Sequence, residues 1–266
     1  MRDVLKPSGT VNGDLWGRKA ADWAAYQEGT IAGVFDEVLT RTGVRENTHY
    51  LDLGCGAGLA ATKASAKGAD VTGLDASKAL LEIARSRLPG VRFHQGDLEE
   101  LPFKSNQFDV VTSFNAIQYA ANPVRAAAEA ARVTAPGGMV AVVTWGEPEG
   151  MEAAGIVAAL KPLLPPPPPG APGPFALSNV DRLRQFAKEG GLEATDVIDV
   201  ECPWLYPDAE TALKGLSSSG VAAKGIMTVG QAAVDQAYAN AIAPFRKTDG
   251  SFRIGATFKV LLAHPS

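Results

Sequence analysis

Cysteine and histidine are scarce in this chain of 266 residues. Only Cys55 and Cys202 are present, which is too few for a disulfide framework and supplies too few thiolates for a structural zinc site. The histidines, His49, His94 and His264, lie far apart in the sequence and lack the i,i+3 or i,i+4 spacing of a metal-binding pair. We therefore predict no metal site and no catalytic triad.

Long apolar runs and an excess of positive charge are also missing. No run of about 18 apolar residues could span a bilayer, and residues 1–9 lack the apolar core of a signal peptide. The formal net charge of −4 provides no general electrostatic attraction to nucleic acid or to an anionic membrane. We therefore expect a cytoplasmic protein without a nucleic-acid or membrane partner, and the sequence leaves the oligomeric state open.

Short apolar runs alternate with helical patterns between residues 48 and 145, which is typical of βαβ units around a parallel sheet. The expected strands cover 49–53, 70–74, 91–95, 108–114 and 139–145, with helices at 58–67, 77–88 and 122–134. Outside this core we expect two helical stretches within 14–42, helices at 178–189, 207–218 and 230–246, strands at 193–201 and 251–262, and an extended proline-rich connector at 161–174. The chain thus reads as a single α/β domain, 1–266, of the Rossmann-like kind.

A glycine-rich turn follows the first expected strand. Residues 48–60 run from an apolar strand through Gly54, Gly56 and Gly58 into a helix. Glycine permits positive φ and a close backbone approach, and the start of the helix presents unpaired N–H groups to a ligand. Gly56, Gly58 and Ala61 also fit the G-x-G-x-x-A frame of dinucleotide-binding proteins. The turn by itself therefore predicts a cofactor site without deciding which cofactor it holds.

Carboxylates follow the next two expected strands. Asp75 ends Val-Thr-Gly-Leu-Asp, where its side chain can accept hydrogen bonds from both hydroxyls of an adenosine ribose. Asp97 follows Gln95-Gly96, and its carboxylate can accept a hydrogen bond from an adenine amine while Leu98 contacts the ring. The alternatives are an ordinary surface carboxylate for Asp75 and a plain Asx turn for Asp97.

The order and spacing of these motifs resemble the class I S-adenosylmethionine-dependent methyltransferases, in particular the type 11 domain and the quinone-biosynthesis methyltransferases. The resemblance covers 49–145 and implies a seven-stranded, mostly parallel sheet with an antiparallel last strand, for which 251–262 is the candidate. It implies S-adenosyl-L-methionine as the cofactor and S-adenosyl-L-homocysteine as its product. The cofactor contacts expected on this basis are Asp52, Gly54, Cys55 and Gly56 for the methionine portion, Asp75 for the ribose, Asp97 and Leu98 for adenine, and Ala76, Asn115 and Tyr26 around them.

The segments outside the 48–145 core, namely 1–45, 146–177 and 203–248, are expected to cover the substrate. Trp16, Trp23 and Tyr26 make the first of them unusually aromatic, so it could close over a ligand or simply dock on the core. The residues expected to contact the substrate are Gln118, Tyr119, Trp145 and Trp204. The alternative for Trp204 is the packing of a helical cap.

Methyl transfer from a sulfonium requires mainly proximity, in-line orientation and the exclusion of water. A general base is needed only for a protonated nucleophile, and Tyr119, Asp208 and Glu210 are the candidates. We therefore predict methyl transfer to an O, N or C atom of a small organic molecule. Two alternatives stay open: a non-catalytic cofactor-binding protein, and a nicotinamide-dependent reductase, against which stands the lack of a Tyr-x-x-x-Lys pair.

Overall fold

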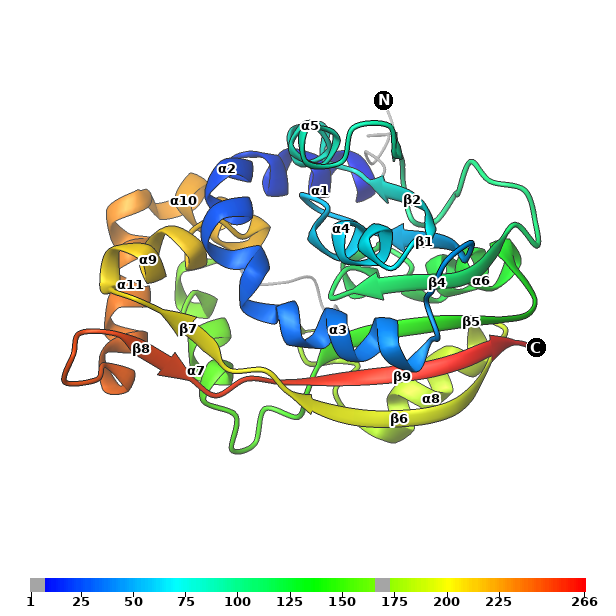
Figure 1. Cartoon of the computed structure of the whole chain (residues 1–266). Coiled ribbons are helices and arrows are strands. Elements are labelled where there is room, and N and C mark those ends of the chain that lie inside the picture. Colours follow the sequence, from blue (N-terminus) through cyan, green and yellow to red (C-terminus); the bar gives the residue numbers. More distant parts are fainter. Residues whose placement is uncertain (1–7, 166–172) are drawn as a thin grey trace, which may run out of the picture.

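The computed structural model describes residues 8–165 and 173–266 and is built around one large sheet (Figure 1). Within the described residues this sheet has seven strands in the order β3-β2-β1-β4-β5-β9-β6. Strand β9 runs antiparallel to both of its neighbours, and the other neighbouring pairs are parallel. The strands are β1 (His49–Leu53), β2 (Asp70–Asp75), β3 (Arg92–Gln95), β4 (Phe108–Phe114), β5 (Thr134–Trp145), β6 (Leu192–Glu201) and β9 (Thr257–Pro265). The predicted mostly parallel α/β sheet with an antiparallel strand is confirmed.

Helices cover both faces of the sheet because successive strand side chains point to opposite faces. Leu51 and Leu53 pack with α6 (Pro123–Val133) and α8 (Val180–Glu189), whereas Tyr50 packs with the helices on the other face. Those helices are α3 (Ala32–Arg41), α4 (Leu59–Ala66) and α5 (Lys78–Arg87). Ser77 caps α5 as predicted, since its Oγ accepts a hydrogen bond from Leu80 N–H. Because strands β1 to β5 run parallel, the loops that follow them lie together at the edge of the sheet formed by the carboxyl ends of these strands.

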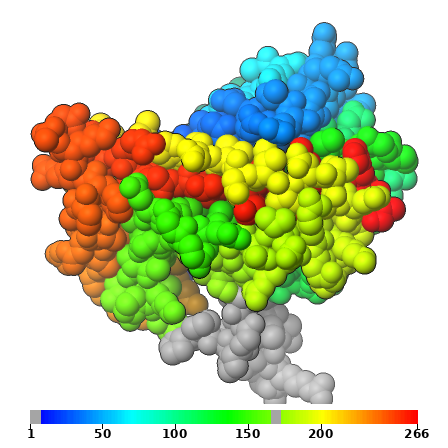
Figure 2. All heavy atoms as spheres, turned by 90° about the horizontal axis from the view of Figure 1, so that it is seen from below, coloured from blue at the N-terminus to red at the C-terminus, as the bar shows by residue number. Residues whose placement is uncertain are grey.

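A helical cap lies beyond that edge (Figure 1). It consists of α7 (Glu152–Ala158), α9 (Ala209–Leu216), α10 (Gly220–Val229), α11 (Gln231–Ile242) and the short helices η4 (Lys161–Leu163) and η5 (Ala243–Phe245), with a small antiparallel pair of strands, β7 (Trp204–Tyr206) and β8 (Phe252–Ile254). Figure 2 shows the orange helices of this cap lying against the green segment around α7, in keeping with the contact between α7 and α11.

The N-terminal segment lies against both the cap and the helix α5 of the sheet layer. It comprises α1 (Ser8–Gly17), α2 (Ala20–Asp22), the π-helix η1 (Trp23–Gln27) and the 3-10 helix η2 (Glu28–Ile31). In Figure 1, α1 and α2 lie beside α5, and α1 also contacts α10. The segment therefore bridges the Rossmann-like core and the cap.

Three sequence expectations need correction. The strand expected at 251–262 is split into β8 and β9, because Gly255 N–H donates to the Glu152 carboxylate and Ala256 O accepts from Cys202 N–H at 2.9 Å, so the ladder is interrupted there. Helix α10 has no counterpart among the predicted elements, since its serine-rich start resembles a loop; Ser219 is in fact its N-cap.

The third correction concerns the proline-rich connector. Lys161–Leu163 forms a 3-10 helix rather than extended chain, because Pro162 is well suited to the first turn of a helix. The rest of this prediction falls largely on residues 166–172, which lie outside the described residues. Among the helices of 8–165 and 173–266, none has both the length and the apolar composition needed to cross a membrane.

Candidate active site

The glycine-rich turn between β1 and α4 has the left-handed backbone that its sequence predicts. Gly54, Gly56 and Gly58 have φ values of 72°, 55° and 85°, which side chains other than glycine rarely tolerate. The N–H groups of Gly54 and Cys55 both donate to Leu74 O, at 2.8 and 3.1 Å. A Cβ at Gly54 would lie 2.3 Å from the Cβ of Ala116. The turn is thus held tightly between the ends of β2 and β4.

Asp52 is a buried carboxylate directly before this turn. Asp52 is only 1% exposed, and its Oδ1 accepts a hydrogen bond from Thr112 Oγ1 at 3.2 Å. Oδ2 has no hydrogen-bond partner among the described residues. Burial raises the pKa of Asp52 to about 7; the Thr112 hydrogen bond lowers it, and the negative charges of Glu28 and Asp75 raise it further. A buried acceptor that lacks a hydrogen-bond donor and has other carboxylates nearby favours a cationic donor.

Asp75, at the end of β2, is tied to the same turn. One carboxylate oxygen accepts from Gly56 N–H at 2.9 Å and the other accepts from Ser77 N–H at 2.8 Å. Burial raises the pKa of this carboxyl, and these backbone hydrogen bonds oppose the rise. Each oxygen of a carboxylate can accept a second hydrogen bond. Asp75 therefore both fixes the turn and retains capacity for a ligand.

Glu28 and Arg87 complete the surroundings of the turn, and the sequence analysis missed both. Glu28 is 5% exposed; its carboxylate accepts from Leu59 N–H at the start of α4 and forms an ion pair with Arg87. Arg87 also donates to Ala57 O and Ala24 O, each at 2.9 Å. Burial raises the pKa of Glu28 against the opposing effects of Arg87. No local motif marks either residue, because their partners are distant in the sequence.

Helix α1 covers the loops where adenine is expected. Asp97 Oδ2 accepts from Gly9 N–H at 2.8 Å, and Asn12 Nδ2 donates to Tyr119 O at 2.8 Å. Gly13 lies so close to the loop after β2 that a Cβ there would be 2.4 Å from Ala76 O. Leu98 is partly buried against the core on the α6 face. The structure therefore places Ala76 and Asp97 against α1, whereas Leu98 packs on the α6 face.

The remaining predicted cofactor contacts, Asn115, Cys55 and Tyr26, lie in different surroundings. Asn115 follows β4 with φ of 51°, and its Oδ1 accepts a hydrogen bond from Gln118 Nε2. The thiol of Cys55 is buried in the core, with Sγ 3.0 Å from the position of a Cβ on Gly73. The ring of Tyr26 lies 5.7 Å from Lys214 Nζ. Trp23 approaches Gly56 instead: its Nε1 lies 3.5 Å from the position of a Cβ on that glycine.

Aromatic side chains from several elements gather between the sheet and the cap. The ring centroids of Trp145 and Trp204 are 5.7 Å apart, and that of Trp16 lies 5.6 Å from Tyr119 and 4.9 Å from Trp23. Tyr119 belongs to the 3-10 helix η3 (Ile117–Tyr119). Burial raises the pKa of Tyr119 to about 12. Its hydroxyl therefore stays protonated near neutral pH, which disfavours a role as a general base.

The other two candidate bases lie on the surface of the cap. Asp208 caps α9, where its carboxylate accepts from Thr211 N–H at 2.7 Å. Glu210 forms an exposed ion pair with Lys214 one helical turn away. Both side chains already have structural partners. The structure does not bring either of them to the glycine turn.

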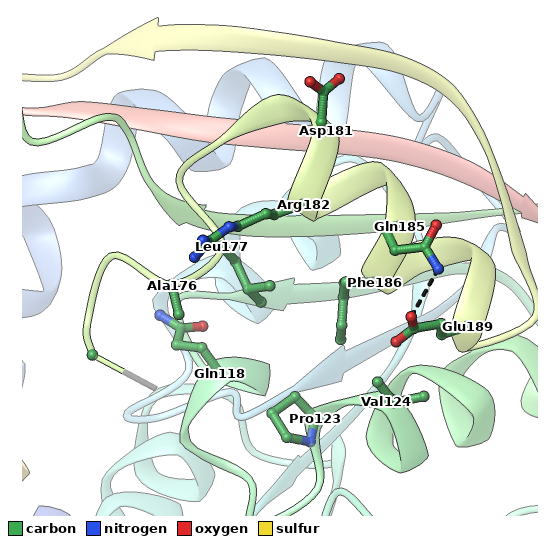
Figure 3. Close-up of a pocket in the computed structure, with 11 residues that line it drawn as sticks. Gln118, Pro123, Val124, Ala176, Leu177, Asp181, Arg182, Gln185, Phe186 and Glu189 are labelled. Atoms are coloured by element: carbon green, nitrogen blue, oxygen red, sulfur yellow. Dashed lines mark hydrogen bonds between the residues drawn. The ribbon is translucent and has the colours of Figure 1, made fainter. Parts of the chain in front are cut away.

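A separate cleft of about 590 Å³ lies between α8 and the start of α6 (Figure 3). Gln118 contributes to its wall, and no predicted cofactor contact does. The cleft is otherwise lined by apolar residues such as Pro123 and Phe186 and by charged residues of α8. Gln118 therefore stands between this cleft and Asn115. Within the described parts of the chain, no group of three or more His, Cys, Asp or Glu side chains is arranged to hold a metal ion.

The strand order and the glycine turn define a class I methyltransferase fold, and comparisons with known proteins agree. Residues 51–142 match the family described as "Methyltransferase domain". An uncharacterized protein of Mycobacterium tuberculosis is 30% identical over 167 residues, which is 61% of this chain and 60% of that protein. Demethylmenaquinone methyltransferase of Staphylococcus aureus is 36% identical over 117 residues, 42% of this chain and 48% of the relative. The chain thus matches only about half to three fifths of these relatives' length.

Solved structures show the same fold over most of the chain. The [4+2]-cyclase SpnF is 25% identical, with a TM-score of 0.56 over 87% of this chain and 80% of that one. A putative methyltransferase from Bacillus halodurans is 18% identical, with a TM-score of 0.59 over 87% of this chain and 99% of that one. Residues 51–142 therefore match a methyltransferase domain, and the fold of solved methyltransferase structures extends over most of the chain.

Proposed function

We propose that this protein transfers a methyl group from S-adenosyl-L-methionine to an O, N or C atom of a small organic molecule. The observation that carries the proposal is the unpartnered Oδ2 of buried Asp52, directly before the glycine turn. The ammonium of an amino acid can donate a hydrogen bond to this oxygen and compensate its charge. A pyrophosphate would instead bring negative charge beside Asp52, Glu28 and Asp75, which is unfavourable. These carboxylates therefore fit the methionine portion of the cofactor better than the pyrophosphate of a dinucleotide.

The surrounding residues fit the rest of the cofactor. The turn from Gly54 to Gly56 allows close backbone approach, and Asp75 has acceptor capacity for the ribose hydroxyls. Asp97 and Leu98 are proposed to contact adenine. Since Gly9 N–H already donates to Asp97 Oδ2, adenine recognition at that oxygen requires α1 to adjust. In this proposal, each portion of the cofactor is held by a different loop.

When bound, the cofactor supplies an electrophilic methyl group on a sulfonium. The protein's own task is to hold the nucleophile in line and to exclude water. The N-terminal segment suits the second role, because Glu28 and Arg87 fasten it over the turn and Trp16 and Trp23 lie on its inner side. Tyr119 is proposed to donate a hydrogen bond rather than to remove a proton, since its pKa is raised to about 12 by burial.

The acceptor is proposed to be a small molecule. Relatives named demethylmenaquinone methyltransferase support such an acceptor, although the partial coverage does not carry their particular substrate to this chain. We further propose that the protein acts without a metal and without a nucleic-acid or membrane partner.

Calorimetric titration with S-adenosylhomocysteine and with reduced nicotinamide dinucleotide tests the cofactor assignment. We expect S-adenosylhomocysteine to bind and Asp52→Asn to weaken it at least tenfold, because the ammonium loses its ionic partner. Asp36→Asn, a change at an exposed carboxylate of α3, is the control. Absence of S-adenosylhomocysteine binding, or tighter binding of the nicotinamide, would refute the proposal.

A second candidate is cofactor binding without methyl transfer. It is favoured by one observation: a neighbour with this fold and 25% identity is described as a [4+2]-cyclase, so the fold alone does not decide the chemistry. Incubation with S-adenosylmethionine and a broad panel of phenols, amines and carbon acids distinguishes the two. Formation of S-adenosylhomocysteine with any acceptor supports methyl transfer, whereas tight cofactor binding without turnover supports the second candidate.

A further inference from the structure

A second cleft, of about 490 Å³, lies at the edge strand β3, and no predicted cofactor contact lines it. One wall is the sheet itself: Thr72 of β2 pairs in register with Arg92 of β3, and His94 follows two residues further along the same strand. Alternate residues of a strand point to the same face, so Arg92 and His94 both face this cleft. The other wall is the loop between β3 and β4, which contributes Pro102, Phe103, Lys104 and Gln107.

The charge of this cleft is opposite to that of the whole chain, whose formal net charge is −4. Arg92, His94 and Lys104 line it, and of the described residues that line it none is Asp or Glu. Asp70, at the start of β2, accepts from Nη2 of Arg92 at 2.9 and 3.1 Å. The Nε and Nη1 donors of that guanidinium can therefore serve a ligand. The cleft thus favours an anion.

His94 lies in an excess of positive charge. Burial lowers the pKa of His94, and the charges of Arg92 and of Arg85 on α5 lower it further. Lys104 of the loop and Asp70, the ion-pair partner of Arg92, are the other charged groups around the cleft. An anion bound here would oppose the effect of both arginines and raise the pKa of His94.

The loop that forms the outer wall is fixed by α6. Arg132 of that helix donates to Leu101 O at 3.1 Å and to Phe103 O at 2.8 Å. Glu129, the ion-pair partner of Arg132, accepts from Leu101 N–H at 2.8 Å. The ring centroid of Phe103 lies 5.1 Å from that of His94, in an edge-to-face arrangement. Because these contacts already order the loop, a ligand loses little affinity to ordering it.

We propose that this cleft is a second ligand site, separate from the cofactor site, which binds the phosphate group of a small phosphomonoester. Arg92 and Lys104 donate charge-assisted hydrogen bonds to the phosphate oxygens from the two walls, and the His94 ring supplies a further donor. The apolar part of the ester packs against Pro102 and Phe103. A phosphomonoester carries up to about two negative charges near neutral pH and three terminal oxygens, which matches these donors better than a carboxylate does.

Nuclear magnetic resonance of the histidine rings tests this site in the full chain. The chain has 3 histidines, so the His94 signal is assigned by its loss in His94→Gln, and the rings of His49 and His264 serve as internal references. The probes are phenyl phosphate, inorganic phosphate and phenol, which offer an anion with a ring, an anion alone and a ring alone. Each is titrated at low ionic strength, because salt screens exposed charges.

We expect phenyl phosphate to bind roughly tenfold more tightly than phenol and roughly threefold more tightly than inorganic phosphate. It should raise the pKa of His94 by about half a unit to one unit and leave the two reference rings unmoved. Lys104→Gln should weaken phenyl phosphate roughly threefold to tenfold. Lys224→Gln, which removes the same charge at an exposed position of α10, is the matched control and should not alter binding.

Equal binding of phenol and phenyl phosphate, an unmoved His94 signal, or equal losses in the two lysine variants would overturn the site. Equal affinity for inorganic phosphate and phenyl phosphate would refute the ester and assign the cleft to free phosphate instead. The wild-type probe series is decisive even without the variants. Binding of S-adenosylhomocysteine is measured separately, so failure of this site leaves the proposed function standing, and the reverse also holds.

Discussion

Thr112 donates its hydroxyl hydrogen to Oδ1 of Asp52 at 3.2 Å and leaves Oδ2 of the same carboxylate unpartnered within the described structure. The Tyr50 hydroxyl lies 2.6 Å from Thr112 Oγ1, so Tyr50 supplies the hydrogen bond that Thr112 accepts. This short relay holds Asp52 in place beside the turn. The relay provides a hydrogen-bond donor for Oδ1, whereas Oδ2 has none among the described residues.

The stability of the ligand-free protein should fall as pH rises through neutrality. The folded-state pKa of Asp52 is raised from 3.8 to about 7, so its contribution is fully present below the unfolded value and is lost as pH rises through about 7. We expect Asp52→Asn to remove on the order of 2 kcal/mol of this decline between about pH 5 and 8. Urea unfolding across this range measures it, and parallel curves for both proteins would contradict the assignment.

Cofactor affinity should change with pH in the opposite direction. An ammonium group binds the ionised form of Asp52, so bound ligand favours loss of the Asp52 proton. We expect S-adenosylhomocysteine to bind roughly tenfold more tightly at about pH 8 than at about pH 6. Calorimetry in buffers of different ionisation enthalpy should detect proton release on binding near neutral pH. A flat profile in the wild type would show that Asp52 does not meet the ammonium.

Replacing Asp75 should weaken the cofactor and loosen the turn together. Asp75→Ala removes the expected ribose contact, about 1.5–3 kcal/mol or more than tenfold in affinity. It also removes the acceptor for the N–H groups of Gly56 and Ser77. Titration with S-adenosylhomocysteine measures the loss, and Asp70→Ala, at an exposed ion pair at the start of the same strand, is the control. Unchanged affinity in Asp75→Ala would remove Asp75 from the cofactor site.

A methyl group on the inner face of α1 should open the cofactor site. In Gly13→Ala the new Cβ would clash with Ala76 O, although alanine favours the helix itself by about 1 kcal/mol. We expect S-adenosylhomocysteine to dissociate several-fold faster, as followed by stopped-flow tryptophan fluorescence. Thr10→Ala, on the exposed side of α1, should leave the rate unchanged. Equal rates for the two variants would show that α1 does not retain the ligand.

The carboxylates of Asp208 and Glu210 should contribute to the stability of α9 and not to cofactor binding. Asp208→Ala removes the N-cap of that helix and should lower the stability of the protein measurably. Glu210→Gln should cost less, because exposed ion pairs one turn apart contribute little. Both variants should bind S-adenosylhomocysteine as the wild type does. A selective loss of cofactor affinity without loss of stability would return either residue to the candidate site.

Much of the cofactor core could be predicted because its signals are local. The alternation at Leu51 and Leu53, the glycines of the turn and the cap at Ser77 are each visible within a few residues. The positive φ values at Gly54, Gly56 and Gly58 confirm the turn. The roles of Asp52, Asp75 and Asp97 toward a cofactor stay predictions, although the structure brings these residues to one end of the sheet.

The surroundings of the site could not be predicted in the same way. Glu28 meets Arg87 across 59 positions of sequence, and Gly9 meets Asp97 across 88. No sequence spacing or motif predicts either pairing, because each depends on how whole helices pack against one another. The division of 251–262 likewise follows from contacts with Glu152 and Cys202 rather than from its own apolar pattern.

The sequence by itself determined the βαβ order, the glycine turn and the carboxylates that follow successive strands, because backbone preference and apolar periodicity are properties of short segments. Only the tertiary structure decided which side chains surround that turn. It left Oδ2 of Asp52 unpaired, placed α1 over Asp97, and set Trp145 beside Trp204. Burial and unmet hydrogen bonds arise only when distant segments exclude water together, and they are the features that give the site its chemistry.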